Sequence, residues 1–184
     1  TSTISPAGAE EIAEVVAATD ATALDAPVSG GDQGARAGTL SFMVGGPEAV
    51  FERHRTLFDT LGSTVTYCGP TGAGQVAKAC NQVVLGATLL GVCEALVFAR
   101  QAGADVEAVL EAIRGGAAAC WTLDTRAPKM LAREFEPGGF VRYLHEDVDV
   151  ARAAASDAGS PMPVTAVVEE LLEAAVQRGY GEAD

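Results

Sequence analysis

One stretch dominates the sequence: Gly72–Arg100, GAGQVAKACNQVVLGATLLGVCEALVFAR, which contains no proline. Its alanine, leucine and valine content predicts one unbroken helix, about 43 Å long at a rise of roughly 1.5 Å per residue. The half from Val83 to Leu90 carries no charge, so we expect it to be buried on all sides. Such a helix would cross a small domain and join its parts.

Lys78 lies near the start of this helix and is one of two lysines in the chain. Asn81 and Gln82 follow three and four residues later, so all three share a helix face. Their neighbours are small or apolar, which indicates a partly desolvated lysine with a lowered pKa, suited to proton transfer. The alternative is a lysine at a helix start whose ammonium reaches water. This stretch alone leaves both interpretations open.

The chain before Gly72 alternates helices and strands and predicts a small α/β piece. Ser5-Pro6 indicates a helix start, continued by residues 7–18. We also expect strands at 22–28, 39–44 and 63–67, a helix at 47–61, and a glycine-rich loop at 30–38. A first βαβ unit is missing, and we interpret the N-terminus as a cut edge.

Everything from Gly72 onward predicts an all-α bundle. Helix breaks are expected at 103, 115–116, 137–139, 160–161 and 179. The C-terminal residues 179–184 are expected to end without a packed element.

The stretch Gly72-Ala-Gly74-Gln-Val-Ala77 matches G-x-G-x-x-A after a strand. In a dinucleotide fingerprint an acidic residue follows at the end of a second strand, whereas Glu94 lies inside the same helix. We therefore reject the fingerprint. The glycines would permit a tight strand-to-helix turn, whose free N–H groups could hold an anion.

Ser29-Gly30-Gly31 lies where a strand ends, the edge at which open α/β sheets bind ligands. A serine hydroxyl and two glycine N–H groups could hold a small carboxylate. A plain turn is the alternative.

Composition excludes several classes of partner. The 184 residues, 48% of them hydrophobic, suffice for one large domain or two small ones. A net charge of −13 argues against nucleic acid or an anionic membrane surface. We expect no membrane span, because polar residues interrupt every apolar run, and no signal peptide at Thr1–Pro6.

The four cysteines show neither a C-x-x-C pair nor ligand-like spacing with His54 or His145. We interpret them as small buried hydrophobic residues in a reducing compartment, the cytoplasm, and expect no metal site.

Four stretches of the sequence are considered as one set of motifs: STISP at 2–6, DAPVSGGDQGARAGTLSFMVGG at 25–46, GAGQVAKACN at 72–81 and FEPGGFVRYLHED at 135–147. Together they resemble the β-hydroxyacid dehydrogenase family, which includes 3-hydroxyisobutyrate dehydrogenase and tartronate semialdehyde reductase. The resemblance covers essentially the whole chain. It implies residues 1–70 as the C-terminal part of a Rossmann-type nucleotide-binding domain. Residues 71–184, with the helix 72–100, would form an all-α substrate and dimerisation domain like the C-terminal domain of 6-phosphogluconate dehydrogenase.

The resemblance also implies roles for individual residues. Lys78 would be the general acid or base, facing a substrate carboxylate held by Ser29, Gly30 and Gly31 across a cleft. Asn81 or Gln82 would orient the substrate hydroxyl or the ammonium. Thr3 would contact the cofactor, NAD or NADP, and the subunits would pack through the helical region as a homodimer or homotetramer.

Three departures accompany the resemblance. The family's N-terminal glycine fingerprint is absent from this sequence. Gln82 stands four residues after the lysine where the family often has asparagine, and the pair Asn81-Gln82 is similar to the tartronate semialdehyde reductase branch, as are 112–116 and 181–184. Glu146 replaces a family lysine that contacts the cofactor, and a carboxylate cannot make that contact beside phosphate.

The resemblance implies an NAD(P)-dependent oxidoreductase of a short β-hydroxy acid or its semialdehyde. The rival hypothesis is a catalytically inactive helical oligomerisation or interaction fragment of such an enzyme. The missing fingerprint separates the two, because without it the chain should bind NAD(P) poorly.

Overall fold

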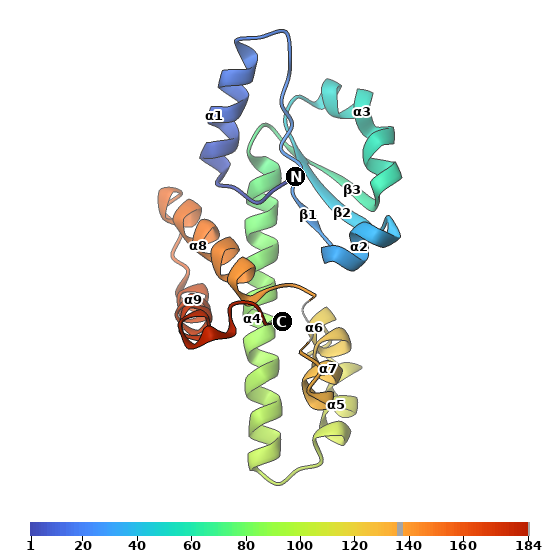
Figure 1. Ribbon diagram of the computed structural model, residues 1–184, viewed down its shortest axis with the longest axis vertical. Helices are drawn as coiled ribbons and strands as arrows, with labels where there is room; N and C mark the ends of the chain where they lie inside the picture. The colour runs from blue at the N-terminus through green and yellow to red at the C-terminus, as the bar shows by residue number, and fades with distance from the viewer. Residues whose placement is uncertain (136–137, 184) are drawn as a thin grey trace.

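The computed structural model describes residues 1–135 and 138–183 (Figure 1). The α/β part contains α1 (Pro6–Ala17), β1 (Val28–Ser29), α2 (Gly31–Ala37), β2 (Leu40–Gly45), α3 (Glu48–Leu61) and β3 (Gly62–Gly69). The helical part contains α4 (Ala73–Gln101), α5 (Val106–Arg114), α6 (Trp121–Thr125), α7 (Ala127–Ala132), α8 (Val141–Asp157), α9 (Pro163–Ala175) and a π-helical turn, η1 (Val176–Tyr180). The predicted fold class, an α/β piece followed by an all-α bundle, is confirmed.

The sheet has the order β1-β2-β3, with β1 antiparallel and β3 parallel to β2. Aromatic side chains fill the space between this sheet and α3: the ring centroids of Phe42 and Phe58 are 5.3 Å apart, and Phe51 stacks on Tyr67 at 5.4 Å. The start of α4 packs against β2. The sheet therefore holds one end of the long helix.

β1 is much shorter than the strand predicted at 22–28. Only Val28 and Ser29 pair regularly with β2, and Asp25 forms an isolated bridge with Gly45. Pro27 lies between them and has no N–H to donate, although its carbonyl accepts from Met43 at 3.0 Å. The segment is extended, but its pairing is interrupted.

The predicted loop at 30–38 was wrong, because Gly31–Ala37 forms the helix α2. Asp32 in its first turn pairs with Arg36 at 2.8 Å, four residues later, and Gly38 ends the helix in the left-handed conformation, φ 66°. The glycine content masked these helix signals.

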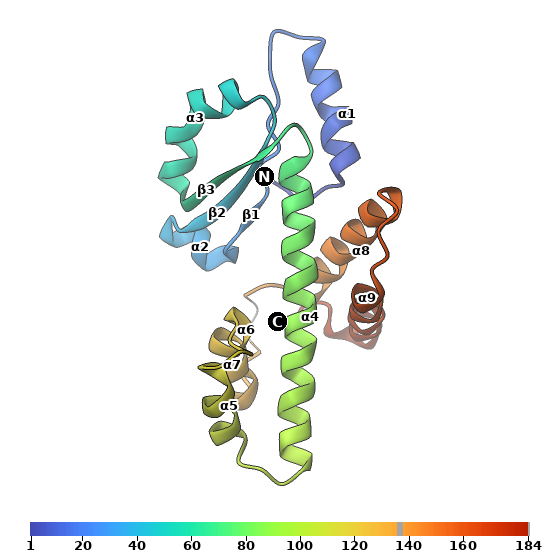
Figure 2. The ribbon, with the colours of Figure 1, turned by 180° about the vertical axis from the view of Figure 1, so that it is seen from behind.

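The helix α4 spans Ala73–Gln101, within one residue of the prediction, and runs through the helical part (Figure 1). Helices α5–α7 pack on one side of it and α8 and α9 on another (Figures 1 and 2). Complete burial of Val83–Leu90 was a wrong prediction, since only Gly86 is buried there and Val84 is 62% exposed. The other helices leave one side of α4 uncovered.

By length and composition α4 could also cross a membrane, with a mean hydropathy of 1.9, which corrects the expectation that no segment could. Its first turns nevertheless hold buried Gln75, Lys78 and Gln82, each with polar partners on other segments. Buried polar residues that bind other segments are typical of the core helix of a folded domain.

Two hydrophobic clusters hold the helical part together, and each includes residues of α4. One joins α4 to α5–α7 and contains Val92, Leu96, Leu110, Leu123 and Ala127. The other joins α8 and α9 through Val148, Val168 and Leu172, with Leu90 of α4 against it. The expected breaks at 103, 115–116, 160–161 and 179 are present, the second of them extending to 120, and unpredicted ones occur at 126 and 133. Residues 136, 137 and 184 lie outside the described part of the chain.

Two further expectations were wrong. The C-terminal segment packs on the start of α8, where the Val141 N–H donates to the Ala183 carbonyl at 2.9 Å and the Arg142 N–H to the Gly181 carbonyl at 3.1 Å. The cysteines are not fully buried: Cys80 is exposed, and Cys68, Cys93 and Cys120 are half-buried.

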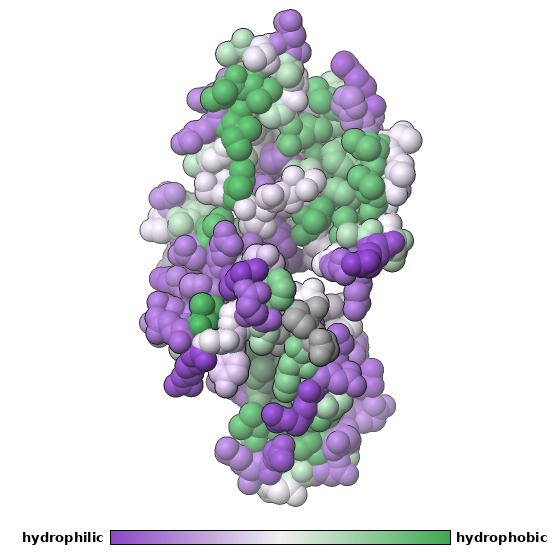
Figure 3. All heavy atoms as spheres, viewed as in Figure 1, coloured by the Kyte–Doolittle hydropathy of each residue, from purple (hydrophilic) through white to green (hydrophobic). Residues whose placement is uncertain are grey.

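Apolar side chains also gather on the surface of the α/β part (Figure 3). On α1, Ile12 is 52% and Val15 74% exposed. The described chain therefore leaves part of α1 without an apolar partner.

Candidate active site

A buried carboxylate anchors the start of α4. Asp25, 8% exposed, accepts hydrogen bonds from the backbone N–H groups of Gly72 at 2.8 Å and Gln75 at 3.0 Å. No side chain of α4 itself caps this helix, and its first turn has no acidic residue. A negative charge at a helix N-terminus is stabilising, so Asp25 supplies the cap from another segment. The turn at Gly72 does bind an anion, but the anion is the protein's own.

Gly74 allows this close approach. A Cβ atom at Gly74 would lie 2.4 Å from the Met43 carbonyl oxygen and 2.7 Å from Asp25 Oδ2. Any side chain here would push α4 away from β2 and Asp25. Gly72, with φ 87°, makes the predicted tight turn from strand to helix, and Gly74 adds a role in helix–sheet packing that was not predicted.

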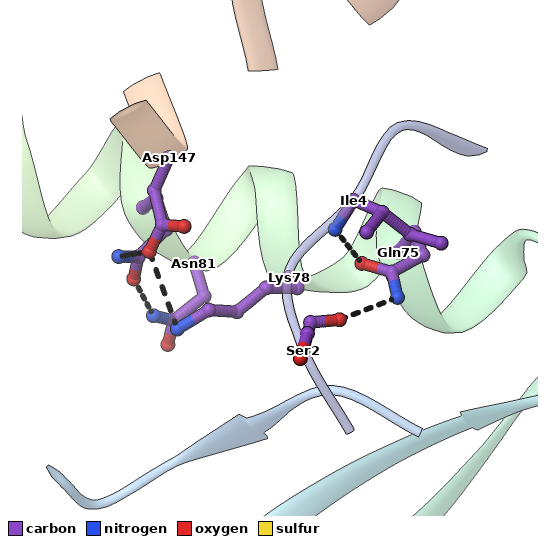
Figure 4. Close-up of polar contacts among 7 residues, drawn as sticks. Ser2, Ile4, Gln75, Lys78, Asn81 and Asp147 are labelled. Carbon is purple, nitrogen blue, oxygen red and sulfur yellow. Dashed lines mark hydrogen bonds and ion pairs between the residues drawn. The ribbon is translucent and has the colours of Figure 1, made fainter. Parts of the chain in front are cut away.

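Lys78 lies one turn further along α4 and is 8% exposed, so the predicted desolvation is confirmed. Its Nζ lies 3.9 Å from Oδ2 of Asp147 on α8 (Figure 4). This separation makes an ion pair but exceeds hydrogen-bond distance. The ammonium is therefore close to one carboxylate while keeping hydrogen-bonding capacity.

Burial lowers the pKa of Lys78 below its usual 10.5, and the charge of Asp147 opposes this by raising it. Burial is the larger effect, because removing an ammonium from water disfavours its charged form. A lysine with a lowered pKa exchanges protons more readily near neutral pH.

Asn81 and Gln82 complete a chain of polar side chains that ends at Asp147. Asn81 Nδ2 donates to Gln82 Oε1 at 2.7 Å, and Gln82 Nε2 donates to Asp147 Oδ2 at 2.5 Å. Lys78 and Gln82 thus share one carboxylate oxygen. These contacts fix the Asp147 carboxylate beside the ammonium.

The predicted carboxylate turn lies at the junction of β1 and α2. Ser29 ends β1, and Gly30 and Gly31 both have positive φ, 130° and 60°. A Cβ atom on Gly31 would lie 3.6 Å from the Gly138 carbonyl oxygen, so this turn meets the segment that leads into α8. Among the described residues no hydrogen bond or ion pair joins Lys78 to Ser29, and the cleft between them stays a prediction.

Thr3 and Glu146, the two positions compared with cofactor contacts of the family, lie in different surroundings. Thr3 is half-exposed in the N-terminal segment, between Ser2 and Ile4, which both bind Gln75 of α4. Glu146 is exposed on α8, next to Asp147. Its negatively charged carboxylate would repel a phosphate.

Sequence reasoning missed three residues that organise the site: Asp25, Gln75 and Asp147. A signal existed for Asp25, because the longest helix has no cap of its own and a lone aspartate stands in an apolar segment upstream. Asp147 ends one of the four stretches that carry the resemblance, but no local spacing indicates that it meets Lys78, since 69 positions separate them and the contact depends on how α8 packs on α4.

No three His, Cys, Asp or Glu side chains group into a metal site within residues 1–135 and 138–183. The candidate site consists of a lysine, a carboxylate and two amide side chains.

Sequence comparison assigns this arrangement, a small sheet joined to a long helix with a buried lysine, to a class of nicotinamide-dependent dehydrogenases. Residues 1–69 match the NAD-binding domain of 6-phosphogluconate dehydrogenase, and residues 72–184 match the family described as NAD-binding of NADP-dependent 3-hydroxyisobutyrate dehydrogenase. The chain belongs to the β-hydroxyacid dehydrogenase family.

Individual relatives support this placement. The chain is 40% identical over 183 residues to 2-hydroxy-3-oxopropionate reductase of Escherichia coli, covering 100% of this chain and 63% of that protein. It is 39% identical over 178 residues to 3-hydroxyisobutyrate dehydrogenase of Pseudomonas aeruginosa, covering 93% and 60%. The structure of Mycobacterium tuberculosis 3-hydroxyisobutyrate dehydrogenase with L-serine superposes with a TM-score of 0.91 at 31% identity, covering 99% of this chain and 65% of that one.

The chain spans about three fifths of the length of the curated relatives it matches. The family uses NAD or NADP. Thr3, whose two neighbours are fixed to α4, fits a contact to such a cofactor. The turn at Gly72 does not fit its phosphates, because the Asp25 carboxylate already fills it.

Proposed function

We propose that the protein to which this chain belongs is an NAD(P)-dependent dehydrogenase of a short β-hydroxy acid or its semialdehyde, of the 3-hydroxyisobutyrate or tartronate semialdehyde type. The observation that carries the proposal is Lys78, buried on α4 with a lowered pKa beside Asp147 and Gln82. The identity to relatives with these two activities supports the substrate class.

In this proposal Lys78 moves the proton. A bound nicotinamide would accept or donate the hydride at the carbon that bears the hydroxyl. In oxidation neutral Lys78 takes the hydroxyl proton as the C–H hydride leaves, and in reduction its ammonium returns that proton to the oxygen. A positioned general acid or base contributes a factor of about 10²–10⁴ in rate.

Ser29, Gly30 and Gly31 hold the substrate carboxylate, and Asn81 or Gln82 orients the hydroxyl or the ammonium. Gln82 is well placed for the second task, since it already fixes the carboxylate that pairs with Lys78. Thr3 contacts the cofactor. Glu146 does not contact the cofactor in this proposal, because its negative charge would repel the cofactor phosphates.

Lys78→Ala tests the proposal in a protein that joins this chain to its dinucleotide-binding region. Oxidation of a panel of β-hydroxy acids with NAD and NADP is measured for this variant and for Lys129→Ala, which removes the other lysine. We expect kcat to fall about 10²-fold or more in Lys78→Ala, with cofactor affinity near normal. Lys129→Ala should behave like the parent. An unchanged kcat in Lys78→Ala would remove this residue from the mechanism.

A second role is favoured by the uncovered side of α4. We propose that the chain forms a homodimer or homotetramer through its helical part, and that by itself it is catalytically inactive. Support for inactivity comes from the G-x-G-x-x-A match at Gly72: because Asp25 caps this turn, it cannot serve as the phosphate site of a dinucleotide, and the proposed enzyme must hold the phosphates elsewhere.

A further inference from the structure

Gln75 holds the residues on both sides of Thr3. Its side chain is almost completely buried, with the residue 3% exposed. Oε1 accepts a hydrogen bond from the Ile4 N–H at 3.2 Å, and Nε2 donates one to the Ser2 carbonyl at 3.0 Å (Figure 4). One side-chain amide therefore binds the backbone immediately before and immediately after Thr3.

Gln75 also belongs to the element that carries the proposed base. It precedes Lys78 by three residues, so both side chains leave α4 on neighbouring parts of one face. Its backbone N–H donates to Asp25 Oδ2 at 3.0 Å, and Asp25 lies four residues before Ser29. Through one residue, α4 is bound to the segment of Thr3 and to the segment that leads to the carboxylate turn.

Ser5, two residues after Thr3, is held as the N-cap of α1, whereas Ser2 and Ile4 depend on Gln75. Residues 1–5 belong to no helix or strand, and within the described chain the Ser2 carbonyl and the Ile4 N–H form these hydrogen bonds with Gln75 alone. A cavity of about 350 Å³ lies beside the segment, with Ser2, Ile4 and Gln75 in its wall. Because packing is incomplete there, the amide bridge sets the position of Thr3 relative to α4.

We propose that Gln75 is a positioning residue, which fixes Thr3 and the nicotinamide it contacts at the distance from Lys78 that joins hydride and proton transfer. This inference rests on the proposed function of Thr3 and Lys78. A near-attack geometry tolerates little displacement, so a loosened bridge should slow the chemical step. Substrate binding at Ser29–Gly31 should be little affected.

Two variants and a control test the bridge. Gln75→Met keeps the length of the side chain but removes both hydrogen bonds. Gln75→Glu keeps the shape and the acceptor for Ile4, but at neutral pH it cannot donate to Ser2. Val76→Ala, at a 49% exposed neighbouring position, is the control.

The first measurement is hydrogen exchange of the Ile4 amide in the 184-residue chain. Gln75→Met should reduce its protection at least about 10-fold while amides in the middle of α4 keep theirs. Val76→Ala should leave it unchanged. Undiminished protection of Ile4 in Gln75→Met would overturn the proposal.

The second measurement is kinetic, in the protein that includes the dinucleotide-binding region. We expect kcat to fall about 10-fold or more in Gln75→Met and at least as far in Gln75→Glu, whose buried carboxylate would repel the Ser2 carbonyl, with KM for the hydroxy acid changed less than about twofold. A larger primary deuterium isotope effect should accompany the fall, which a mere loss of folded protein would not produce. If Gln75→Met does not fold, Gln75→Asn carries the same test, because it keeps an uncharged amide that is one methylene too short to reach both Ser2 and Ile4.

The outcomes separate the two proposals. If the parent protein oxidises no β-hydroxy acid, the proposed function has failed, and with it the positioning role, whereas the amide exchange still decides whether the bridge exists. If the parent is active and kcat is unchanged although Ile4 is deprotected, only the positioning role is overturned.

Discussion

Lys78 lies among groups that act on its pKa in opposite directions. Burial lowers it, and the carboxylate of Asp147 at 3.9 Å raises it. The separation is too long for a hydrogen bond, so the carboxylate acts mainly through its charge. A lysine balanced in this way can hold a proton for reduction and lose it for oxidation.

Asp147→Asn should shift the pH dependence of oxidation to lower pH. The substitution removes the charge that raises the pKa of Lys78, so this pKa falls further and the neutral base appears at lower pH. Asparagine can still accept from Gln82. The rising limb of kcat/KM against pH is compared with that of Asp149→Asn, an exposed position on α8. If kcat/KM of Asp147→Asn rises at the same pH as in the parent, or at a higher pH, the assignment of Lys78 as the base is contradicted.

Lys78→Met should raise the free energy of unfolding at pH 7. Because the folded-state pKa lies below the unfolded value of 10.5, the unfolded chain binds more protons between the two pKa values. The stability of the parent protein therefore rises with pH through that window, as Lys78 becomes neutral in the folded state. The advantage of Lys78→Met should shrink as pH approaches about 10.

Urea unfolding of the 184-residue chain at pH 7 and near pH 10 measures this difference, with Lys129→Met as control. The control should show no comparable pH dependence. The prediction fails if Lys78→Met is less stable than the parent at pH 7 and the difference in free energy of unfolding does not change with pH. Burial of the ammonium would then not lower the stability of the folded chain.

At this scale the sequence predicted the desolvation of Lys78 correctly, because small and apolar neighbours on one helix are visible in local spacing. It did not predict the partner of Lys78. Asp147 reaches the lysine only after α8 packs on α4, and Gln75 finds Ser2 and Ile4 through a contact across 71–73 positions. Local patterns contain no information on such distant pairs.

Among the elements, α4 depends on a cap from outside its own sequence. Asp25 satisfies two N–H groups of its first turn, and Gly74 lets β2 and Asp25 approach the helix closely. The strength of this joint decides whether Lys78 keeps its place relative to the sheet and the Ser29–Gly31 turn.

Asp25→Ala should lower the free energy of unfolding by roughly 2–4 kcal/mol, because it removes a helix cap and leaves two buried N–H groups unpaired. Asp32→Ala is the matched control, since Asp32 is exposed in the first turn of α2. In Asp32→Ala the free energy of unfolding should fall by no more than about 1 kcal/mol. Urea denaturation compares the two variants, and a loss in Asp25→Ala no larger than in the control would show that the cap is not needed.

Helices and strands were predicted correctly where the periodicity of apolar residues agrees with capping, proline and glycine signals at the ends. α1, β2, α3, β3 and α4 lie within about two residues of the predicted ranges, because Ser5-Pro6, Gly45-Gly46, Pro47 and Gly69 mark their ends. α2 was missed, since its glycines outweighed the Asp32–Arg36 pair. Pro27 shortened β1 to the last two residues of an otherwise extended segment.

Across the whole molecule, the uncovered side of α4 forms a largely apolar stripe that Glu94 interrupts. Cys80, Val84, Ala87, Gly91 and Phe98 follow one another at intervals of three, four or seven residues. Val84 is 62% and Phe98 73% exposed, and Figure 2 views α4 from a side that no other helix crosses. The stripe extends about 27 Å at roughly 1.5 Å per residue, and Glu94 is the charged residue along it.

We predict that this stripe packs against a second copy of the chain. Small residues at Cys80, Ala87 and Gly91 let another helix approach closely, and a self-complementary surface favours a two-fold dimer. A charge placed in the stripe would be desolvated on association, so Val84→Glu and Phe98→Glu should each weaken or abolish it. Val15→Glu, at a 74% exposed position on α1, is the control and should leave assembly unchanged. Sedimentation at micromolar concentration measures the outcome: the parent and Val15→Glu should sediment as a species heavier than the 18.7 kDa chain, and the stripe variants toward that mass. A parent chain that sediments as a monomer would refute the interface.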